Sequence, residues 1–288
     1  MNYEQFVQDI FECTKTKVFP WGIVEKQEIV KNNGVVAIGL TIRRMESNLA
    51  PIIYLEGIYN YFLQGESLED LADFLIENSR KISNVHKINY KEFLEFPKIR
   101  EHIVYKLVNA KRNEKLLGDI PHLPLFDLAI VFYWIVPTGE GEYGSVLIKN
   151  SHMNLWKLPV SVLYECAKEN TKKIFPYMFR PLNEYVNDTA GISLEKSPLY
   201  ILSNTEGIFG ASAILYPEMP GKIYKILGEK YYLLPSSVHE FLIVPENRLV
   251  HPKNLKAMVK EVNETQIMEE ELLSDNVYYF DGDIITEM

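Results

Sequence analysis

The sequence is short of cysteine and of long hydrophobic runs, and each shortage excludes a class of protein. Two cysteines, Cys13 and Cys166, stand among 288 residues, too few for a secreted scaffold held by disulfides. Both lie beside apolar residues in helix-like runs, so we interpret them as buried, reduced thiols. The longest apolar run, Leu128–Val136, has the length of a strand and is too short to cross a bilayer.

The first residues lack the basic segment and the apolar segment of a secretory signal peptide. Reduced thiols fit a reducing compartment. We therefore expect a cytoplasmic protein that does not enter a membrane.

Basic charge is also scarce. The chain has 30 Lys and Arg against 39 Asp and Glu, a net charge of −9 and a pI near 5.3. A surface that follows nucleic-acid phosphates needs clustered Lys and Arg, and here they are scattered. A nucleic-acid partner is therefore disfavoured, while an acidic inhibitor of a nucleic-acid-binding protein stays open as a third possibility.

Familiar catalytic motifs are missing. The chain has no G-x-S-x-G, no G-x-x-x-x-G-K-[ST], no H-E-x-x-H and no C-x-x-C. The pair Gly207 and Gly210 has the spacing of a phosphate loop but no lysine follows it, so we interpret it as a turn. No cofactor is predicted, and the missing motifs favour a binding protein over an enzyme.

The remaining composition is that of a globular protein with a sizeable core. Hydrophobic residues make up 47% of the chain and charged residues 24%. The 18 tyrosines and 14 phenylalanines predict an aromatic-rich core or interface. The order of helical and strand patterns predicts an α+β fold of mainly antiparallel sheets with flanking helices.

Residues 1–85 are predicted to form an N-terminal α+β subdomain. Apolar residues at helical spacing follow Tyr3, and two β-rich runs around an Asn-Asn-Gly turn predict a hairpin. A strand at 51–55 and two helices follow, the second capped by Ser67. We interpret the polar run 78–89 as a linker.

Residues 90–250 are predicted to form the central and C-terminal α+β domain. Its most apolar run, Phe126–Val136, does not alternate with polar residues, which predicts a strand buried on both faces. A helix is expected from Pro159 to Lys173. We interpret 119–124 as a loop and 176–198 as irregular.

The stretch Tyr200–Asn247 organises this second domain. Its apolar runs, separated by polar turns, predict a β-β-α-β-β block. The second strand is expected at Ala211–Leu215 and the helix at Met219–Leu227, closed by a glycine. Residues 251–288 are predicted to hold a final helix and an acidic, aromatic tail.

Two clusters of polar side chains lie at breaks of this block. Serine, histidine and a carboxylate are the ingredients of an activated nucleophile. If the protein is a hydrolase or transferase acting on a small molecule, its site is expected among six residues: Asn204, Glu206, Ser236, Ser237, His239 and Glu240. Neighbours in a strand point to opposite faces, which argues against a His239–Glu240 pair, and the serines equally fit a turn.

Two further candidate sites lie outside that stretch. His122, Asp127 and His152 flank the central strands at loop junctions, where sites often lie, but no metal-ligand spacing joins them. The aromatic run Val277–Phe280, namely Val277, Tyr278, Tyr279 and Phe280, is a candidate docking site for another protein. Its simpler interpretation is a strand that packs on its own domain.

Five segments of the chain are typical of a known family, namely Ser151–Trp156, Ala167–Thr171, Leu234–Glu240, Asn254–Gln266 and Leu273–Tyr278. On these segments the chain resembles an uncharacterised family of bacterial proteins, a domain of unknown function that is common in gut-dwelling Gram-positive bacteria. The resemblance spans residues 2–280 and implies no activity and no catalytic residue.

The sequence therefore leaves the function unknown. It favours a cytoplasmic, protein-binding or regulatory protein over the hydrolase or transferase with a site at Ser236–Glu240. The acidic inhibitor comes third. The oligomeric state is not predicted.

Overall fold

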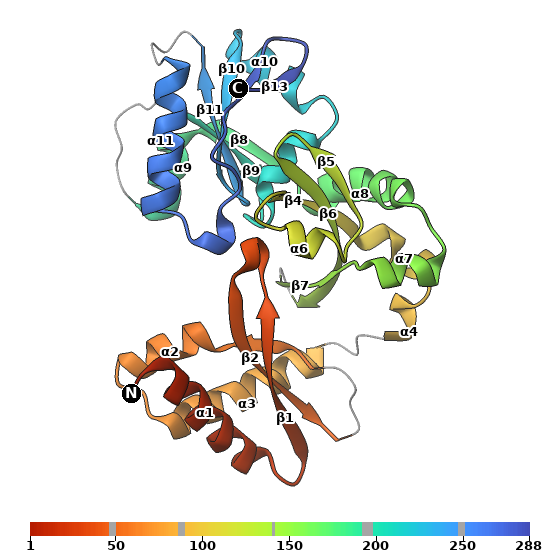
Figure 1. Ribbon diagram of the computed structural model, residues 1–288, viewed down its shortest axis with the longest axis vertical. Coiled ribbons are helices and arrows are strands. Elements are labelled where there is room, and N and C mark those ends of the chain that lie inside the picture. Colours follow the sequence, from red (N-terminus) through yellow and green to blue (C-terminus); the bar gives the residue numbers. More distant parts are fainter. Residues whose placement is uncertain (46–49, 86–89, 140–141, 192–197, 247–250) are drawn as a thin grey trace. The chain divides into compact units, whose positions relative to one another are not determined.

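The computed structural model describes residues 1–45, 50–85, 90–139, 142–191, 198–246 and 251–288 (Figure 1). Helices and three mostly antiparallel sheets confirm the predicted α+β class. The chain divides into two compact units, a smaller one of residues 1–90 with 136–144 and a larger one of 91–135 with 145–288. Within the described ranges, no helix is both long and apolar enough to cross a membrane.

The smaller unit packs three helices on an antiparallel sheet of strand order β1-β2-β3. As predicted, Ser67 caps the third helix, because its hydroxyl accepts a hydrogen bond from the backbone N–H of Asp70 at 3.1 Å. The elements are α1 Tyr3–Val18, β1 Gly22–Val30, η1 Asn32–Gly34, β2 Val36–Arg44, β3 Ile52–Tyr54, α2 Leu55–Leu63 and α3 Leu68–Val85.

The predicted linker at 78–89 is wrong over its first part. Helix α3 continues to Val85, and Ser79 is buried with its hydroxyl donating to the carbonyl of Ile42 at 2.7 Å. Ser79 lies on the buried face of α3, where its hydroxyl bonds to the neighbouring strand. Because Ser79 is polar, the apolar periodicity of α3 is not apparent in the sequence. Residues 86–89 lie outside the described residues.

The first sheet of the larger unit has strand β6 between β4 and β5, with β7 also paired to β6. The end of β6 at 136–139 and the start of β7 at 142–144 belong to the smaller unit. Strand β4 is an edge strand whose outward N–H groups are capped by side chains, since Tyr105 donates to Thr171 Oγ1 and Leu107 donates to Ser212 Oγ, both at 3.1 Å. The elements are α4 Tyr90–Phe93, α5 Phe96–Ile99, η2 Arg100–His102, β4 Ile103–Asn109, α6 Glu114–Leu117, β5 His122–Leu125, β6 Leu128–Gly139, β7 Glu142–Leu147, α7 Asn150–Trp156 and α8 Val160–Ile174.

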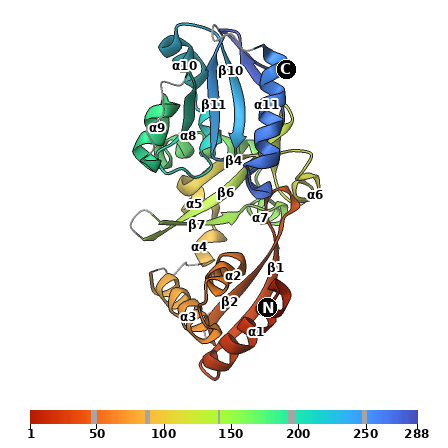
Figure 2. The same cartoon turned by 90° about the vertical axis from the view of Figure 1, so that its left-hand side faces the viewer.

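The second sheet of this unit is six-stranded, in the order β13-β12-β10-β11-β9-β8. Helix α11 lies along β10 and β11 (Figure 2), and its Leu255 and Val259 pack on Tyr232, Leu234 and Val244 of that face. The elements are β8 Tyr177–Pro181, α9 Leu182–Ala190, β9 Tyr200–Asn204, η3 Gly210–Leu215, α10 Met219–Leu227, β10 Tyr231–Ser237, β11 Glu240–Pro245, α11 Pro252–Thr265, η4 Glu269–Glu271, β12 Tyr278–Phe280 and β13 Ile285–Glu287.

One predicted strand of the β-β-α-β-β block is wrong: Gly210–Leu215 forms a 3-10 helix. Strand β9 already pairs with β11 and β8, so neither of its edges is free for a hairpin partner. Gly210 also lies so close to β9 that a Cβ atom there would meet Ser203 Oγ at 2.2 Å and the His239 carbonyl oxygen at 2.3 Å. The remaining strands and the helix of the block are as predicted.

Other elements were missed where proline or weak periodicity concealed them. The expected loop 119–124 contains β5, in which Pro124 pairs with Ala129; a proline is tolerated there because β5 is an edge strand. The expected irregular region 176–198 contains β8 and α9. Helix α7 was not predicted, and the indole of its Trp156 donates to the carbonyl of Phe93 at 3.2 Å.

Candidate functional site

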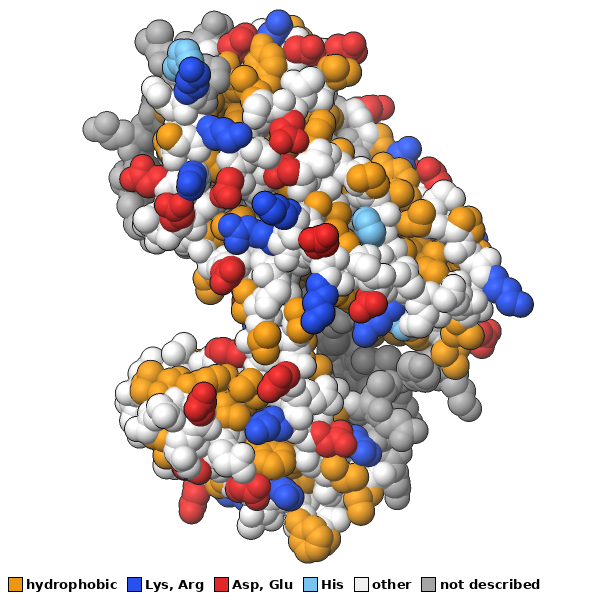
Figure 3. Space-filling model, in the orientation of Figure 1, with side chains coloured by type: hydrophobic (Ala, Val, Ile, Leu, Met, Phe, Trp, Pro, Cys, Tyr) orange, Lys and Arg blue, Asp and Glu red, His pale blue; other side chains and the backbone are white. Residues whose placement is uncertain are grey.

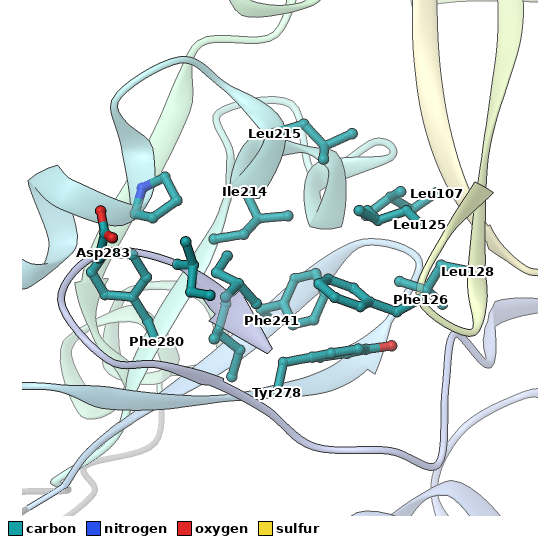
Figure 4. A pocket seen from close by; sticks show the side chains of 14 residues that line it. Leu107, Leu125, Phe126, Leu128, Ile214, Leu215, Phe241, Tyr278, Phe280 and Asp283 are labelled. Atoms are coloured by element: carbon teal, nitrogen blue, oxygen red, sulfur yellow. The ribbon is translucent and has the colours of Figure 1, made fainter. Parts of the chain in front are cut away.

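An apolar pocket of about 270 Å³ lies in the larger unit. It is formed by one face of the six-stranded sheet with the β12–β13 turn, by the 3-10 helix η3 and the start of α10, and by the strands and turn around β5 (Figure 4). Its lining residues are Leu107, Leu125, Phe126, Leu128, Ile214, Leu215, Pro220, Leu233, Phe241, Tyr278, Phe280, Asp283, Ile284 and Ile285.

Strand alternation explains which side chains of the sheet reach the pocket. Leu233 is the register partner of Tyr278, so both point to the same face. Their sequence neighbours point the other way: Tyr232 and Leu234 pack under α11. One face of β10 thus packs against α11, and the other face lines the pocket.

Phe126 closes part of the pocket through an uncommon backbone conformation. It stands in the two-residue turn between Leu125 and Leu128 with a φ of 54°, a region that non-glycine residues rarely adopt. Its ring packs 5.4 Å from the ring of Tyr278, yet 45% of the residue remains exposed. Phe126 therefore lies where the pocket meets solvent.

The polar groups of the pocket lie at its periphery. Figure 4 shows Asp283 at one end and Leu107, Leu125 and Leu128 at the other, with Phe241 between them. Asp283 belongs to the exposed turn between β12 and β13. The pocket thus offers an apolar interior with one carboxylate at the end opposite Leu125 and Leu128.

The hydroxyl of Tyr278 is not free for a ligand. It donates to the Asp127 carboxylate, which also accepts from the Ser274 hydroxyl at 2.6 Å. Burial raises the pKa of Tyr278 well above its usual range, and the Asp127 charge adds to this effect. This pair anchors the wall of the pocket and leaves its interior apolar.

The predicted cluster at Ser236–Glu240 has the geometry of a turn. The hydroxyl of Ser237 donates to Glu240 Oε1 at 2.9 Å and accepts from the backbone N–H of His239 at 3.0 Å. The His239 imidazole instead faces Glu271, with Nε2 3.7 Å from Oε1. Ser237 and His239 therefore do not form the side-chain pair that an activated serine needs.

The other predicted polar residues also serve turns. The buried amide of Asn204 donates to the carbonyl of Ile208 at 2.6 Å and accepts from the N–H of Glu206 at 3.1 Å. Glu206 is exposed, and Ser236 is half-buried at the bulge of β10. The six candidates thus lie in or beside turns at one end of the sheet.

The three metal candidates have separate surroundings. His122 Nδ1 lies 3.1 Å from the carbonyl of Ile120, and Asp127 binds Tyr278 and Ser274 as above. His152 Nδ1 accepts from the N–H of Lys149 at 3.0 Å. Across the described ranges, no group of three or more His, Cys, Asp or Glu residues is arranged to hold a metal ion.

Three of the four residues proposed for partner docking face the interior. Val277, Tyr278 and Phe280 are 3% exposed or less, and β12 pairs with β10 in the sheet. Tyr279 is half-buried, and its hydroxyl donates to Glu246 Oε1 at 2.7 Å. This geometry favours the interpretation of the run as a strand on its own domain.

The pocket was missed because its lining comes from segments distant in the sequence. No periodicity in one segment indicates that Leu107, Ile214 and Phe241 meet. The only local signal is the conspicuous aromatic residue in the turn, Phe126.

Comparisons with known proteins give a family without a known activity. A search of curated proteins and a search of solved structures each found no significant match. A family model described as "Family of unknown function (DUF5688)" matches residues 3–282. The chain therefore belongs to this family of unknown function.

Proposed function

We propose that this protein is a cytoplasmic binding protein, with a regulatory role, that takes up a small apolar molecule in the pocket of its larger unit. One observation carries the proposal: an apolar pocket of about 270 Å³ that reaches the surface beside Phe126 and Ile284. Such a pocket with few polar groups at its edge is the usual form of a small-molecule site.

The volume limits the size of the ligand. An apolar cavity of about 150 Å³ holds benzene, and sites for drug-sized ligands begin near roughly 300 Å³. A volume of 270 Å³ fits a molecule of about two fused rings or a short branched chain. Long acyl chains are too large to be enclosed.

The charge at the Asp283 end of the pocket selects the polar end of the ligand. Two lining residues carry ionisable side chains, Asp283 and Tyr278. The Tyr278 hydroxyl is bonded to Asp127, so the Asp283 carboxylate is the group that can meet a ligand. A carboxylate repels an anionic ligand and favours a cationic or hydrogen-bond-donating end. An aromatic or branched aliphatic amine therefore fits better than the corresponding acid.

The three functions considered from the sequence have less support. The buried run Val277–Phe280 offers little surface to a protein partner. An enzyme at Ser236–Glu240 lacks a hydrogen-bonded Ser237–His239 side-chain pair. On the face of the larger unit drawn in Figure 3, acidic and basic side chains are interspersed, which gives an acidic inhibitor no support there.

Isothermal titration of the full chain with 1-naphthylmethylamine and with 1-naphthoate tests the proposal. We expect the amine to bind and the acid to bind at least about tenfold more weakly, a difference of roughly 1.4 kcal/mol. Lack of binding by a series of apolar amines of this size would overturn the proposal.

A pair of tryptophan variants shows whether binding occurs in the pocket. Leu215→Trp adds bulk to a half-buried lining residue and should abolish binding. Ile226→Trp, on an exposed position of α10 outside the lining, is the matched control and should bind as the natural protein does. Equal binding by both variants would place the ligand elsewhere.

A further inference from the structure

Lys106 is a buried lysine outside the pocket. It stands in the middle of β4 with 8% of its surface exposed, opposite Val131 of β6. The adjacent Leu107 lines the pocket, so Lys106 points to the other face of the sheet. An ammonium group at such a position requires an explanation, because burying a charge without close partners is costly.

The Lys106 amine lies near aromatic rings, and no close carboxylate in the described ranges balances its charge. Its Nζ lies 4.8 Å from the centre of the Phe209 ring, which packs 5.3 Å from the ring of Tyr133. Within the described part of the chain, no carboxylate forms an ion pair with Nζ within 4.0 Å. Phe209 itself has a φ of 57°, so the backbone holds this ring in a conformation that is rarely adopted.

Acidic and imidazole groups complete the cluster. Glu270 and Glu271 of η4 act on the charge of Lys106, and Glu271 Oε1 lies 3.7 Å from His239 Nε2. The other ring nitrogen, His239 Nδ1, is buried and has no hydrogen-bond partner among the described residues. The charge of Glu271 thus acts on the Lys106 amine, and the same carboxylate faces the His239 imidazole.

Burial has a chemical consequence for the amine. It lowers the pKa of Lys106 to about 8, although the two glutamates act in the opposite direction. At pH 7.5 roughly a quarter of Lys106 amines are then neutral, against roughly one in a thousand for an ordinary lysine. Only the neutral amine has the lone pair that attacks an electrophile.

We propose that Lys106 is a nucleophilic amine that forms a reversible imine with a small, uncharged aldehyde or ketone. The amine nitrogen adds to the carbonyl carbon, and the carbonyl oxygen takes up a proton. The carbinolamine then loses this oxygen as water, the nitrogen loses its protons, and a C=N bond remains. Addition of water reverses the step, so no oxidant or reductant is needed.

The cluster also defines the class of carbonyl compound. The carboxylates of Glu270 and Glu271 disfavour an anionic substrate such as a keto acid. The rings of Phe209 and Tyr133 favour an apolar substituent. This proposal does not depend on ligand binding in the pocket.

Reductive trapping tests the proposal on the full, natural chain. The protein is treated with benzaldehyde and sodium cyanoborohydride at pH 7.5, and labelled lysines are identified by peptide mass mapping. We expect Lys106 to be labelled about a hundredfold faster than the exposed Lys225. Labelling of Lys106 at the rate of Lys225 or below would overturn the proposal.

Two variants separate a nucleophile from a structural lysine. Lys106→Arg keeps the charge but cannot form an imine, so the fast-labelled peptide should disappear, whereas the matched change Lys225→Arg should leave it intact. Glu271→Gln removes a charge that raises the Lys106 pKa, so Lys106 should be labelled severalfold faster at pH 7. An unchanged or slower rate in Glu271→Gln would contradict the arrangement described.

Discussion

Tyr278 donates its phenolic hydrogen to the carboxylate of Asp127, a residue 151 positions earlier in the chain. The bond joins β12 to the turn between β5 and β6 and therefore connects the two sheets of the larger unit. The sequence had singled out both residues, one for a metal and one for a protein partner. In the structure they bind each other and anchor the wall of the apolar pocket.

Tyr278→Phe removes this bond and leaves the Asp127 carboxylate with Ser274 as its remaining side-chain donor. Because hydrogen bonds to charged groups are strong, we expect the free energy of unfolding to fall by about 2 kcal/mol. Tyr279→Phe is the matched control, since its hydroxyl bonds to Glu246 at an exposed site, and should cost about 0.5 kcal/mol or less. Urea unfolding compares the two; equal losses would contradict the prediction.

Gly210→Ala should be strongly destabilising. Its Cβ atom would approach Ser203 Oγ to 2.2 Å and the His239 carbonyl oxygen to 2.3 Å, so backbone has to move. We expect a loss of about 3 kcal/mol. Gly221→Ala, in helix α10 with no atom within 4 Å of the added carbon, should instead stabilise the protein by about 0.5 kcal/mol. Thermal unfolding should show a lower melting temperature for Gly210→Ala and a higher one for Gly221→Ala than for the natural protein.

Ser212→Ala tests the capped edge of β4. The Ser212 hydroxyl accepts the hydrogen bond of the buried Leu107 N–H, so the variant leaves a buried donor without this partner. The expected cost is about 2 kcal/mol. Ser67→Ala, at the exposed cap of α3 in the smaller unit, should cost about 1 kcal/mol. Amide hydrogen exchange should show faster exchange at Leu107 in Ser212→Ala only, and protection retained there would contradict the account.

Lys106→Met should raise stability in a manner that depends on pH. The folded protein lowers the pKa of Lys106 from 10.5 to about 8, so the unfolded chain binds the proton more tightly. Below about pH 8 the folded state bears the full cost of the buried charge, and that cost disappears as pH rises toward 10.5. We expect the variant to be more stable by roughly 3 kcal/mol at pH 7 and equal near pH 10.5. Denaturant unfolding at pH 7, 9 and 10.5 measures the difference; a constant difference would be the contrary result.

Much of the fold could be predicted from the sequence because local patterns determine it. The hairpin around Asn32–Gly34, the central strand in 126–136 and helix α10 closed by Gly228 each depend on periodicity and turn residues within one segment. The predictions for 119–124 and 211–215 were wrong because pairing with other strands determines the structure of these segments. An edge position tolerated the prolines of β5, and a fully paired β9 prevented a further strand.

The two proposed sites could not be predicted in this way. Lys106 is a single polar residue in an alternating strand, which resembles a position on a solvent-facing side. Its surroundings include the ring of Phe209 and the charges of η4, both more than a hundred residues later. The pocket likewise requires the turn at Phe126, η3 and the six-stranded sheet to meet.

If the pocket binds a ligand as we propose, its assembly from distant segments links ligand binding to the stability of the folded protein. A ligand bound between β4, η3 and β12 has no binding site in the unfolded chain. At a hundred times its Kd, such a ligand adds about 2.7 kcal/mol to stability. Cellular degradation acts on the unfolded fraction. The amount of this protein in a cell would then follow the supply of its ligand, without any change in its synthesis.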